Sequence, residues 1–128
     1  MNETCSIVLP LPPRCLSPNM QPGSIGSRIK KAAAAKKYRR LAKEAAEGER
    51  IETGPWMLAS ATAVFHHSTK RRRDDVNSLA MLKPAYDGIV DSGVLFDDDS
   101  EHLKTLTPEF KTDKEFPRVE ITLERMDQ

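Results

Sequence analysis

The sequence predicts one α+β domain (α/β in a broader classification), in which a single mixed sheet packs against two main helices. Three observations support this fold class. The length of 128 residues suits one domain, which we expect to span residues 1–128. Strand-like and helix-like segments follow one another in the order strand, helix, strand, helix, strand, strand. Near the C-terminus, Val119, Ile121 and Leu123 alternate with charged residues, as in a half-exposed strand.

The first half of the chain is expected to form a strand, a loop and a long helix. Residues 5–13, CSIVLPLPP, contain a short apolar run that prolines end, which is typical of a strand. Residues 14–26 are rich in proline and glycine and should form a loop. Good helix formers dominate the segment from Arg28 to Glu47, and Gly48 offers a stop.

The second half is expected to add a strand, a helix and further short strands. Residues 55–67, PWMLASATAVFHH, fit a strand. Apolar residues then recur at spacings of three and four and predict a helix face toward the sheet: Val76, Leu79, Leu82, Tyr86 and Ile89. Pro84 should kink this helix or break its first turn. A turn at residues 92–93 leads to SGVLF, a strand entry, and residues 101–106, EHLKTL, should form a short strand.

The cysteines and the N-terminal segment indicate a cytoplasmic protein. Cys5 and Cys15 form no CxxC pair and have no matching Cys/His set for zinc, so reduced thiols are expected. The segment MNETCSIVLPLPP has no basic region before its apolar run, so we expect no signal peptide. No stretch of about 18 apolar residues occurs, so we expect no membrane span.

Positive charges are clustered although the formal net charge is only +1. Eight Lys or Arg lie between Arg28 and Lys43 without an Asp or Glu, and four more form the run from Lys70 to Arg73. Such clusters indicate a surface that faces a polyanion. The expected nucleic-acid-binding residues are Arg28, Lys30, Lys31, Lys36, Lys37, Arg39, Arg40, Lys70, Arg71, Arg72 and Arg73.

Two charge blocks, KRRRDDVN at residues 70–77 and DDDSE at residues 97–101, are candidates for one site. Asp74 and Asp75 should lie at a strand-to-helix junction, and the turn at residues 92–93 should return the second block to the same end of the sheet. Clustered carboxylates suit Mg²⁺ or Mn²⁺, and a divalent ion beside many cations suggests phosphodiester chemistry. Alternatively, both blocks and the basic helix are solvated surface, and His66 and His67 are surface residues at a strand end.

The segment from Arg71 to Leu103, RRRDDVNSLAMLKPAYDGIVDSGVLFDDDSEHL, resembles the RusA family of Holliday junction resolvases (crossover junction endodeoxyribonucleases) of bacteria and prophages. The shared pattern is a basic run, a variant of Asp-x-Asp-Asn, a helix with a Lys and an Asp-Gly, then Gly-Val and a double or triple Asp. SIVLPLPPRCLSPN is similar to the family's first strand and Pro-Pro loop, and PRVEITLERM to its last strand.

The resemblance implies an Mg²⁺-dependent (or Mn²⁺-dependent) endodeoxyribonuclease that cuts four-way junctions and other branched DNA as a homodimer, in the cytoplasm of a cell that carries a phage or prophage. The catalytic residues that it implies are Asp74, Asp75, Asn77, Lys83 and Asp98. The metal ligands that it implies are Asp74, Asp75, Asp97 and Asp98.

The chain departs from the family pattern at two positions. Val76 stands where the second Asp of Asp-x-Asp-Asn belongs, so Asp75 or Asn77 is expected to replace that carboxylate. The pattern's Lys, three residues after the Asn, is Ala80 here, and Lys83 is the nearest lysine; as a purely structural residue, Lys83 would pair with Asp87. Two other functions stay open. One is a junction-binding protein that does not cut, which the replacement of a carboxylate by Val76 supports, and the other is a structural domain with solvated charge blocks.

Overall fold

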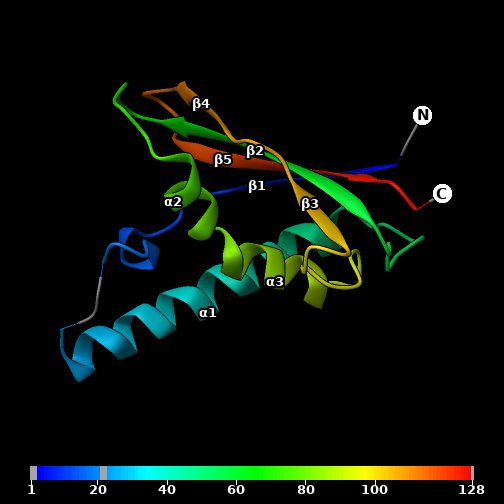
Figure 1. Cartoon of the computed structure of the whole chain (residues 1–128), viewed down its shortest axis with the longest axis horizontal. Helices are drawn as coiled ribbons and strands as arrows, with labels where there is room; N and C mark the ends of the chain where they lie inside the picture. Colours follow the sequence, from blue (N-terminus) through cyan, green and yellow to red (C-terminus); the bar gives the residue numbers. More distant parts are fainter. Residues whose placement is uncertain (1–2, 21–22, 128) are drawn as a thin grey trace.

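The computed structural model describes residues 3–20 and 23–127, so residues 21–22 of the expected loop and residues 1, 2 and 128 lie outside the described part. Within it, one mixed sheet packs against helices that lie on one of its faces (Figure 1), which confirms the predicted α+β fold class. The elements in chain order are β1 (Thr4–Leu9), η1 (Arg14–Leu16), α1 (Ile25–Gly48), β2 (Ala59–His67), α2 (Asp75–Ala80), α3 (Lys83–Asp91), β3 (Leu103–Thr105), β4 (Glu109–Thr112) and β5 (Arg118–Arg125).

The sheet is built around β5 and β2. β5 pairs antiparallel with β1 on one side and with β2 on the other, and β3 and β4 pair parallel with the second edge of β2. Alternate residues of the three long strands are buried on the helix side; in β5 these are Val119, Ile121 and Leu123, as the alternating pattern predicts. The core therefore lies between this face and the helices.

The strand β4 was not predicted, because it forms through its pairing with β2 and not through a pattern of its own. β3 covers the first part of β2, where Ala59 is opposite Leu103, and β4 covers the last part, where Phe65 is opposite Phe110. Pro108 lies between them and has no N–H to donate, so the edge is divided into two short strands. Short strands with little local pattern gain their stability from the partner strand.

The predicted basic helix is confirmed as α1, and only its C-terminal half is deeply buried. The hydroxyl of Ser24 accepts a hydrogen bond from the N–H of Ser27 and so caps the first turn. Tyr38 is the first fully buried residue of the helix, and its hydroxyl donates to the carbonyl of Pro10 at 2.7 Å. The N-terminal half extends beyond the sheet (Figure 1) and carries its cations in solvent.

The second predicted helix is broken into α2 and α3, as Pro84 predicts. α2 ends at Ala80 and α3 begins at Lys83, with Pro84 in its first turn. Leu82 and Ile89 are fully buried and Leu79 is half-buried, but the expectation that Val76 also faces the sheet is wrong, since 78% of it is exposed. Because the helix is broken, the apolar face of α3 does not continue along the first turn of α2.

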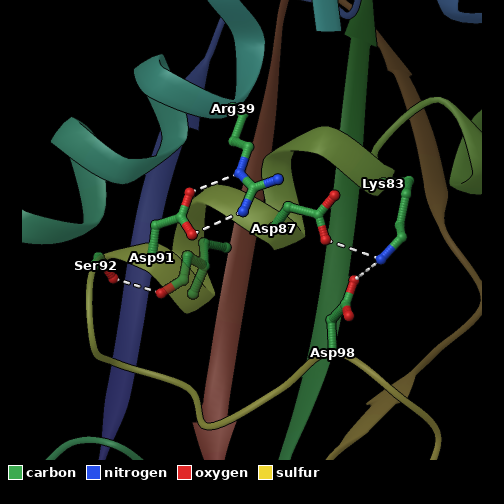
Figure 2. A network of polar contacts seen from close by, with 7 residues as sticks. Arg39, Lys83, Asp87, Asp91, Ser92 and Asp98 are labelled. Carbon is green, nitrogen blue, oxygen red and sulfur yellow. Dashed lines mark hydrogen bonds and ion pairs between the residues drawn. The ribbon is translucent and has the colours of Figure 1, made fainter. Parts of the chain in front are cut away.

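α3 lies in direct backbone contact with α1. A Cβ on Gly88 would stand 2.1 Å from the carbonyl oxygen of Arg39 and 2.9 Å from the backbone nitrogen of Lys43, so only glycine allows this approach. Beside the contact, the guanidinium of Arg39 donates two hydrogen bonds to Asp91, at 2.6 and 2.9 Å (Figure 2). α3 then ends in a turn at Gly93, whose φ of +90° suits glycine.

Trp56 connects the chain ends to the segment before β2. Its side chain is fully buried, and its indole N–H donates to the hydroxyl of Thr53 at 2.9 Å. That hydroxyl donates to Glu3 at 2.7 Å, and Glu3 also accepts from Arg125 at 2.8 Å. The beginning of β1 and the end of β5 are thereby held at one end of the sheet.

Two further properties bear on the expectations from the sequence. Cys5 is buried and Cys15 is half-buried, and both are free thiols. Burial raises the pKa of Cys5 to about 11. Within the described ranges, no helix combines the length and the apolar character needed to cross a bilayer.

The helix phase can be tested with two substitutions. We expect Leu82→Ala to lower the free energy of unfolding by about 2–5 kcal/mol, since it empties a fully buried position. Val76→Ala, on the exposed first turn of α2, should change it by less than about 0.5 kcal/mol. Urea unfolding followed by circular dichroism measures both; equal losses in the two variants would show that the assigned phase is wrong.

Candidate nucleic-acid interface

A basin of about 680 Å³ opens where β2 ends and α2 begins. We call it the arginine basin, because its lining includes Arg14 of η1 and the consecutive residues Arg71, Arg72 and Arg73 that precede α2. Its apolar side is formed by Leu11, Met20, Phe65 and Met81. The basin therefore combines a wall of four cations with an apolar side.

The cations of the arginine basin are available to an external anion. Within the described residues, Arg14, Arg71 and Arg72 form no ion pair, and Arg73 donates only to the carbonyl of Thr69, at 3.2 Å. Partial burial lowers the pKa of Arg73, and repulsion by the positive charge of Arg71 lowers it further. An anion that enters the basin would relieve this repulsion.

Asp74 and Asn77 line the same basin from the first turn of α2. Asp74 is the N-cap, and its Oδ1 accepts from the N–H of Asn77 at 3.0 Å. The side-chain oxygen of Asn77 in turn accepts from the hydroxyl of Ser17 at 3.0 Å, which ties η1 to α2. Asp75, the next residue, is exposed, and its side chain has no hydrogen bond or ion pair with any described residue. The predicted strand-to-helix junction is therefore confirmed for both carboxylates.

The two histidines at the end of β2 are not surface residues, so that expectation is wrong. His66 is buried and its Nε2 lies 2.6 Å from Oε1 of Glu120. His67 is half-buried, and its ring stacks on Phe65 and Phe110 with centroids 6.0 and 6.2 Å away. Its Nε2 is buried and has no hydrogen-bond partner among the described residues.

The surroundings of His67 disfavour its protonated form. Burial lowers the pKa of the imidazole, and the positive charges of Arg73 and Arg71 lower it further. A neutral ring adds no repulsion to the basin, whose lining already contains four arginines. His67 therefore contributes an uncharged aromatic surface to the cationic basin.

Lys83 of α3 and Asp98 of the loop after α3 form a separate cluster (Figure 2). The ammonium of Lys83 lies 2.8 Å from Asp87 and 2.5 Å from Asp98, so the i+4 pairing with Asp87 is confirmed. Only 13% of the Asp98 side chain is exposed. Burial alone would raise the pKa of Asp98, but the hydrogen bond and charge of Lys83 outweigh it, and the pKa lies below its usual value.

The two charge blocks lie at opposite ends of β2, so the expectation that they meet at one end of the sheet is wrong. Asp74 follows the end of β2, at His67. The acidic loop leads into β3, which pairs with the beginning of β2: Leu103 is opposite Ala59. Figure 1 shows this loop beside α3, away from the turn that enters α2. The parallel pairing of β3 with β2 dictates this placement.

The described residues do not present a ready-made metal site. Within residues 3–20 and 23–127, no group of three or more Asp, Glu, His or Cys side chains is placed to hold a metal ion. Asp98 is engaged by Lys83, and Oδ1 of Asp97 accepts from the N–H of Asp98 at 2.7 Å. The four predicted ligands thus fall into two pairs, Asp74 with Asp75 and Asp97 with Asp98, and this arrangement does not fit a divalent ion without a rearrangement.

The cations of α1 are mostly exposed, as predicted, with two qualifications. Arg39 is not free, because it forms the two hydrogen bonds to Asp91. Arg28 and Lys31 line a groove of about 400 Å³ together with Lys83. The structure therefore places part of the basic helix and Lys83 along one surface. The remaining predicted contacts of this helix, namely Lys30, Lys36, Lys37 and Arg40, are exposed on it.

Most lining residues of the arginine basin were not among the predicted site residues, and the polar ones with a role in the site are Arg14, Ser17 and His67. Arg14 and Ser17 lie in a proline-rich loop, where no periodicity indicates which side chains point inward. His67 had one available signal, since it follows Phe65 at the strand period of two and so shares its face. A scan of the sequence against protein-family models finds no match, and a search of curated proteins finds none either.

The neutral state of His67 predicts a pH dependence of stability. In the unfolded chain, His67 takes up a proton near its ordinary pKa of 6.5, whereas in the folded chain its pKa is lower. The contribution of His67 to the free energy of unfolding is therefore fully present above pH 6.5 and is lost as the pH falls below it. His67→Phe keeps an aromatic ring that cannot titrate. Between pH 8 and pH 5, the wild-type protein should therefore lose more unfolding free energy than the variant.

Urea unfolding at both pH values measures this difference. His66 and His102 are present in both proteins, so they cancel in the comparison. A difference between wild type and His67→Phe that stays constant with pH would show that His67 titrates normally in the folded protein.

Proposed function

We propose that this protein is a RusA-like endonuclease that binds branched DNA, including four-way junctions, and cuts its phosphodiester bonds. The observation that carries the proposal is the arginine basin, in which Arg14, Arg71, Arg72 and Arg73 lie beside the Asp74 cap of α2. The ordered motif from Arg71 to Leu103 supports the nuclease class, and the basin supports DNA as the ligand.

Phosphate binding is the part of the proposal that the geometry supports best. Guanidinium groups bind phosphate oxygens in a bidentate manner, and Arg14, Arg71 and Arg72 have no competing ion pair within the described residues. The groove with Arg28 and Lys31 extends the positive surface along α1, whereas Lys83, which also lines it, is paired with Asp87 and Asp98. A branched DNA presents several backbone segments, so separate cationic surfaces on one protein suit it.

Cutting is proposed to need Mg²⁺ or Mn²⁺, with Asp74, Asp75, Asp97 and Asp98 as the ligands. Because these two pairs lie at opposite ends of β2, they could share one ion only after a rearrangement. A bound ion would supply charge stabilisation and an activated water. Between the two candidates for the carboxylate missing at Val76, the contacts favour Asp75. Its carboxylate is exposed and unpaired within the described residues, whereas the side-chain oxygen of Asn77 already accepts a hydrogen bond from Ser17.

A junction-binding protein that does not cut is the second candidate. Two observations favour it: Val76 replaces a carboxylate of the motif, and Lys83 already neutralises Asp98. In either function we propose a homodimer, because a four-way junction has two-fold symmetry and paired cuts need two related sites. We further propose that the protein acts in the cytoplasm of a bacterial cell that carries a phage or prophage.

DNA binding predicts a steep dependence on salt. Between 50 and 200 mM NaCl, the logarithm of junction affinity should fall linearly with the logarithm of the salt concentration. Arg71→Ala with Arg72→Ala should flatten this slope by about 2, since each lost phosphate contact removes about 0.9. The same test on Lys36→Ala with Lys37→Ala shows how far α1 participates.

Lys104→Ala is the matched control, because this exposed lysine of β3 lies at the beginning of β2, away from the basin. Fluorescence anisotropy of a labelled junction in EDTA gives the affinities. If the Arg71 and Arg72 substitutions leave the salt slope unchanged, the basin is not part of the DNA interface.

Metal-dependent cutting predicts that the carboxylates are essential for turnover but not for binding. Asp74→Asn, Asp75→Asn and Asp98→Asn should each abolish nicking of a synthetic four-way junction with Mg²⁺, while junction affinity stays equal or rises as negative charge is removed. Denaturing gel electrophoresis of labelled strands measures nicking, and EDTA is the control for metal dependence.

Three outcomes separate the candidates. Tight binding without nicking by the wild-type protein, with either Mg²⁺ or Mn²⁺, would establish the non-cutting function. Nicking that survives in both Asp74→Asn and Asp98→Asn would exclude a shared site. Nicking that survives in Asp75→Asn but is lost in Asn77→Ala would assign the missing role to Asn77.

A further inference from the structure

We infer that the arginine basin binds one unpaired nucleotide of a DNA strand, with its base against the aromatic and apolar side and its phosphate against the arginines. This inference rests on the proposed function only for the source of the nucleotide, which is branched DNA. It goes beyond phosphate binding, because it assigns the basin a preference for an extrahelical base.

The basin is larger than a backbone phosphate requires. Its volume of about 680 Å³ lies within the range of roughly 300–1,000 Å³ that is typical of pockets for small organic ligands. Leu11, Met20, Phe65 and Met81 add apolar side chains to its lining, next to the four arginines. A duplex would touch such a concave surface only at its rim, whereas a single base extends from its backbone and can enter.

The aromatic side is organised as a stack in which Phe65 is buried and His67 is half-buried, so His67 is the ring that a base can reach. The rings of Phe65 and His67 are nearly parallel, with an interplanar angle of 5° and centroids 6.0 Å apart. Phe110 of β4 supports both rings, with its centroid 5.5 Å from that of Phe65. Every base has a flat π face, so an aromatic platform next to cations is the arrangement by which proteins hold single-stranded nucleic acid.

His67 adds a second observation that points to a ligand. Its Nε2 has no hydrogen-bond partner among the described residues, although it is buried. Buried polar atoms without partners are uncommon in folded proteins, because each costs the desolvation of the group. The edge of a base carries the donors and acceptors that a small shift of this ring would allow it to meet.

The cationic wall supplies the other half of a nucleotide site. Arg71 and Arg72 lie within a few residues of His67 in the sequence and line the same basin, so phosphate and base sites lie side by side. Arg14 enters from η1, which the hydrogen bond between Ser17 and Asn77 fixes to α2. The spacing between the two halves is therefore set by the fold before DNA binds.

The test compares three labelled duplexes of one sequence: fully paired, with a single-nucleotide bulge, and with an abasic bulge. The abasic bulge keeps the extra phosphate and removes only the base. Anisotropy in EDTA at constant salt measures affinity without cutting. We expect the base-containing bulge to bind about 5- to 140-fold more tightly than the abasic bulge, as stacking of one base implies.

Two variants assign this preference to the basin. His67→Ala removes a ring of the stack, and Ser78→Leu places a bulky side chain on the α2 side of the lining. Each should lower the affinity for the bulged base toward that for the abasic bulge and leave the abasic affinity unchanged. Ser100→Leu is the matched control, since Ser100 is exposed in the acidic loop and does not line the basin.

Equal binding of the bulged and abasic duplexes by the wild-type protein would overturn the inference and leave the proposed nuclease intact. A base preference that persists in both His67→Ala and Ser78→Leu would place the base elsewhere and also overturn it. A base preference without junction nicking would overturn the proposed cutting alone. No measurable binding of any of the three duplexes would overturn both.

Discussion

The contact between α1 and α3 at Gly88 is the constraint on which the positions of the other elements depend. Because a Cβ there would collide with the backbone of α1, the two helices meet at a distance that only glycine permits. The paired hydrogen bonds between Arg39 and Asp91 lie next to this contact. With α3 fixed, Lys83 is held where it reaches Asp98, and the short connection through Leu82 fixes the end of α2.

The same constraint explains why the arginine basin has a defined shape although loops form much of it. One wall follows β2, the central strand, and another belongs to α2, which α3 positions. The loop wall from η1 is joined to α2 by the hydrogen bond from Ser17 to Asn77. Asn77 is a motif residue, so part of what resembles a catalytic motif also holds the basin together.

Local patterns were sufficient for the elements that bury one regular face. The alternation in β5, the composition of α1 and the break at Pro84 all predicted what the structure contains. Features that depend on distant partners were missed: β4 exists because β2 offers it an edge, and Val76 is exposed because the helix phase changes at the break.

The placement of the acidic loop follows from topology in the same way. α2 and α3 carry the chain back along the sheet, so the following strand must run parallel to β2 and start at the beginning of β2. The candidate site was therefore predictable in its residue types and in its junction, but not in which carboxylates meet.

Trp56 gives the protein an internal optical probe. It is the single tryptophan of the chain, it is fully buried, and its indole N–H is held by Thr53 at the end of the sheet where the chain begins and ends. The arginine basin lies past the other end of β2. Intrinsic fluorescence therefore reports whether the end of the sheet around Trp56 is folded. Nucleic acid in the basin would not contact this fluorophore.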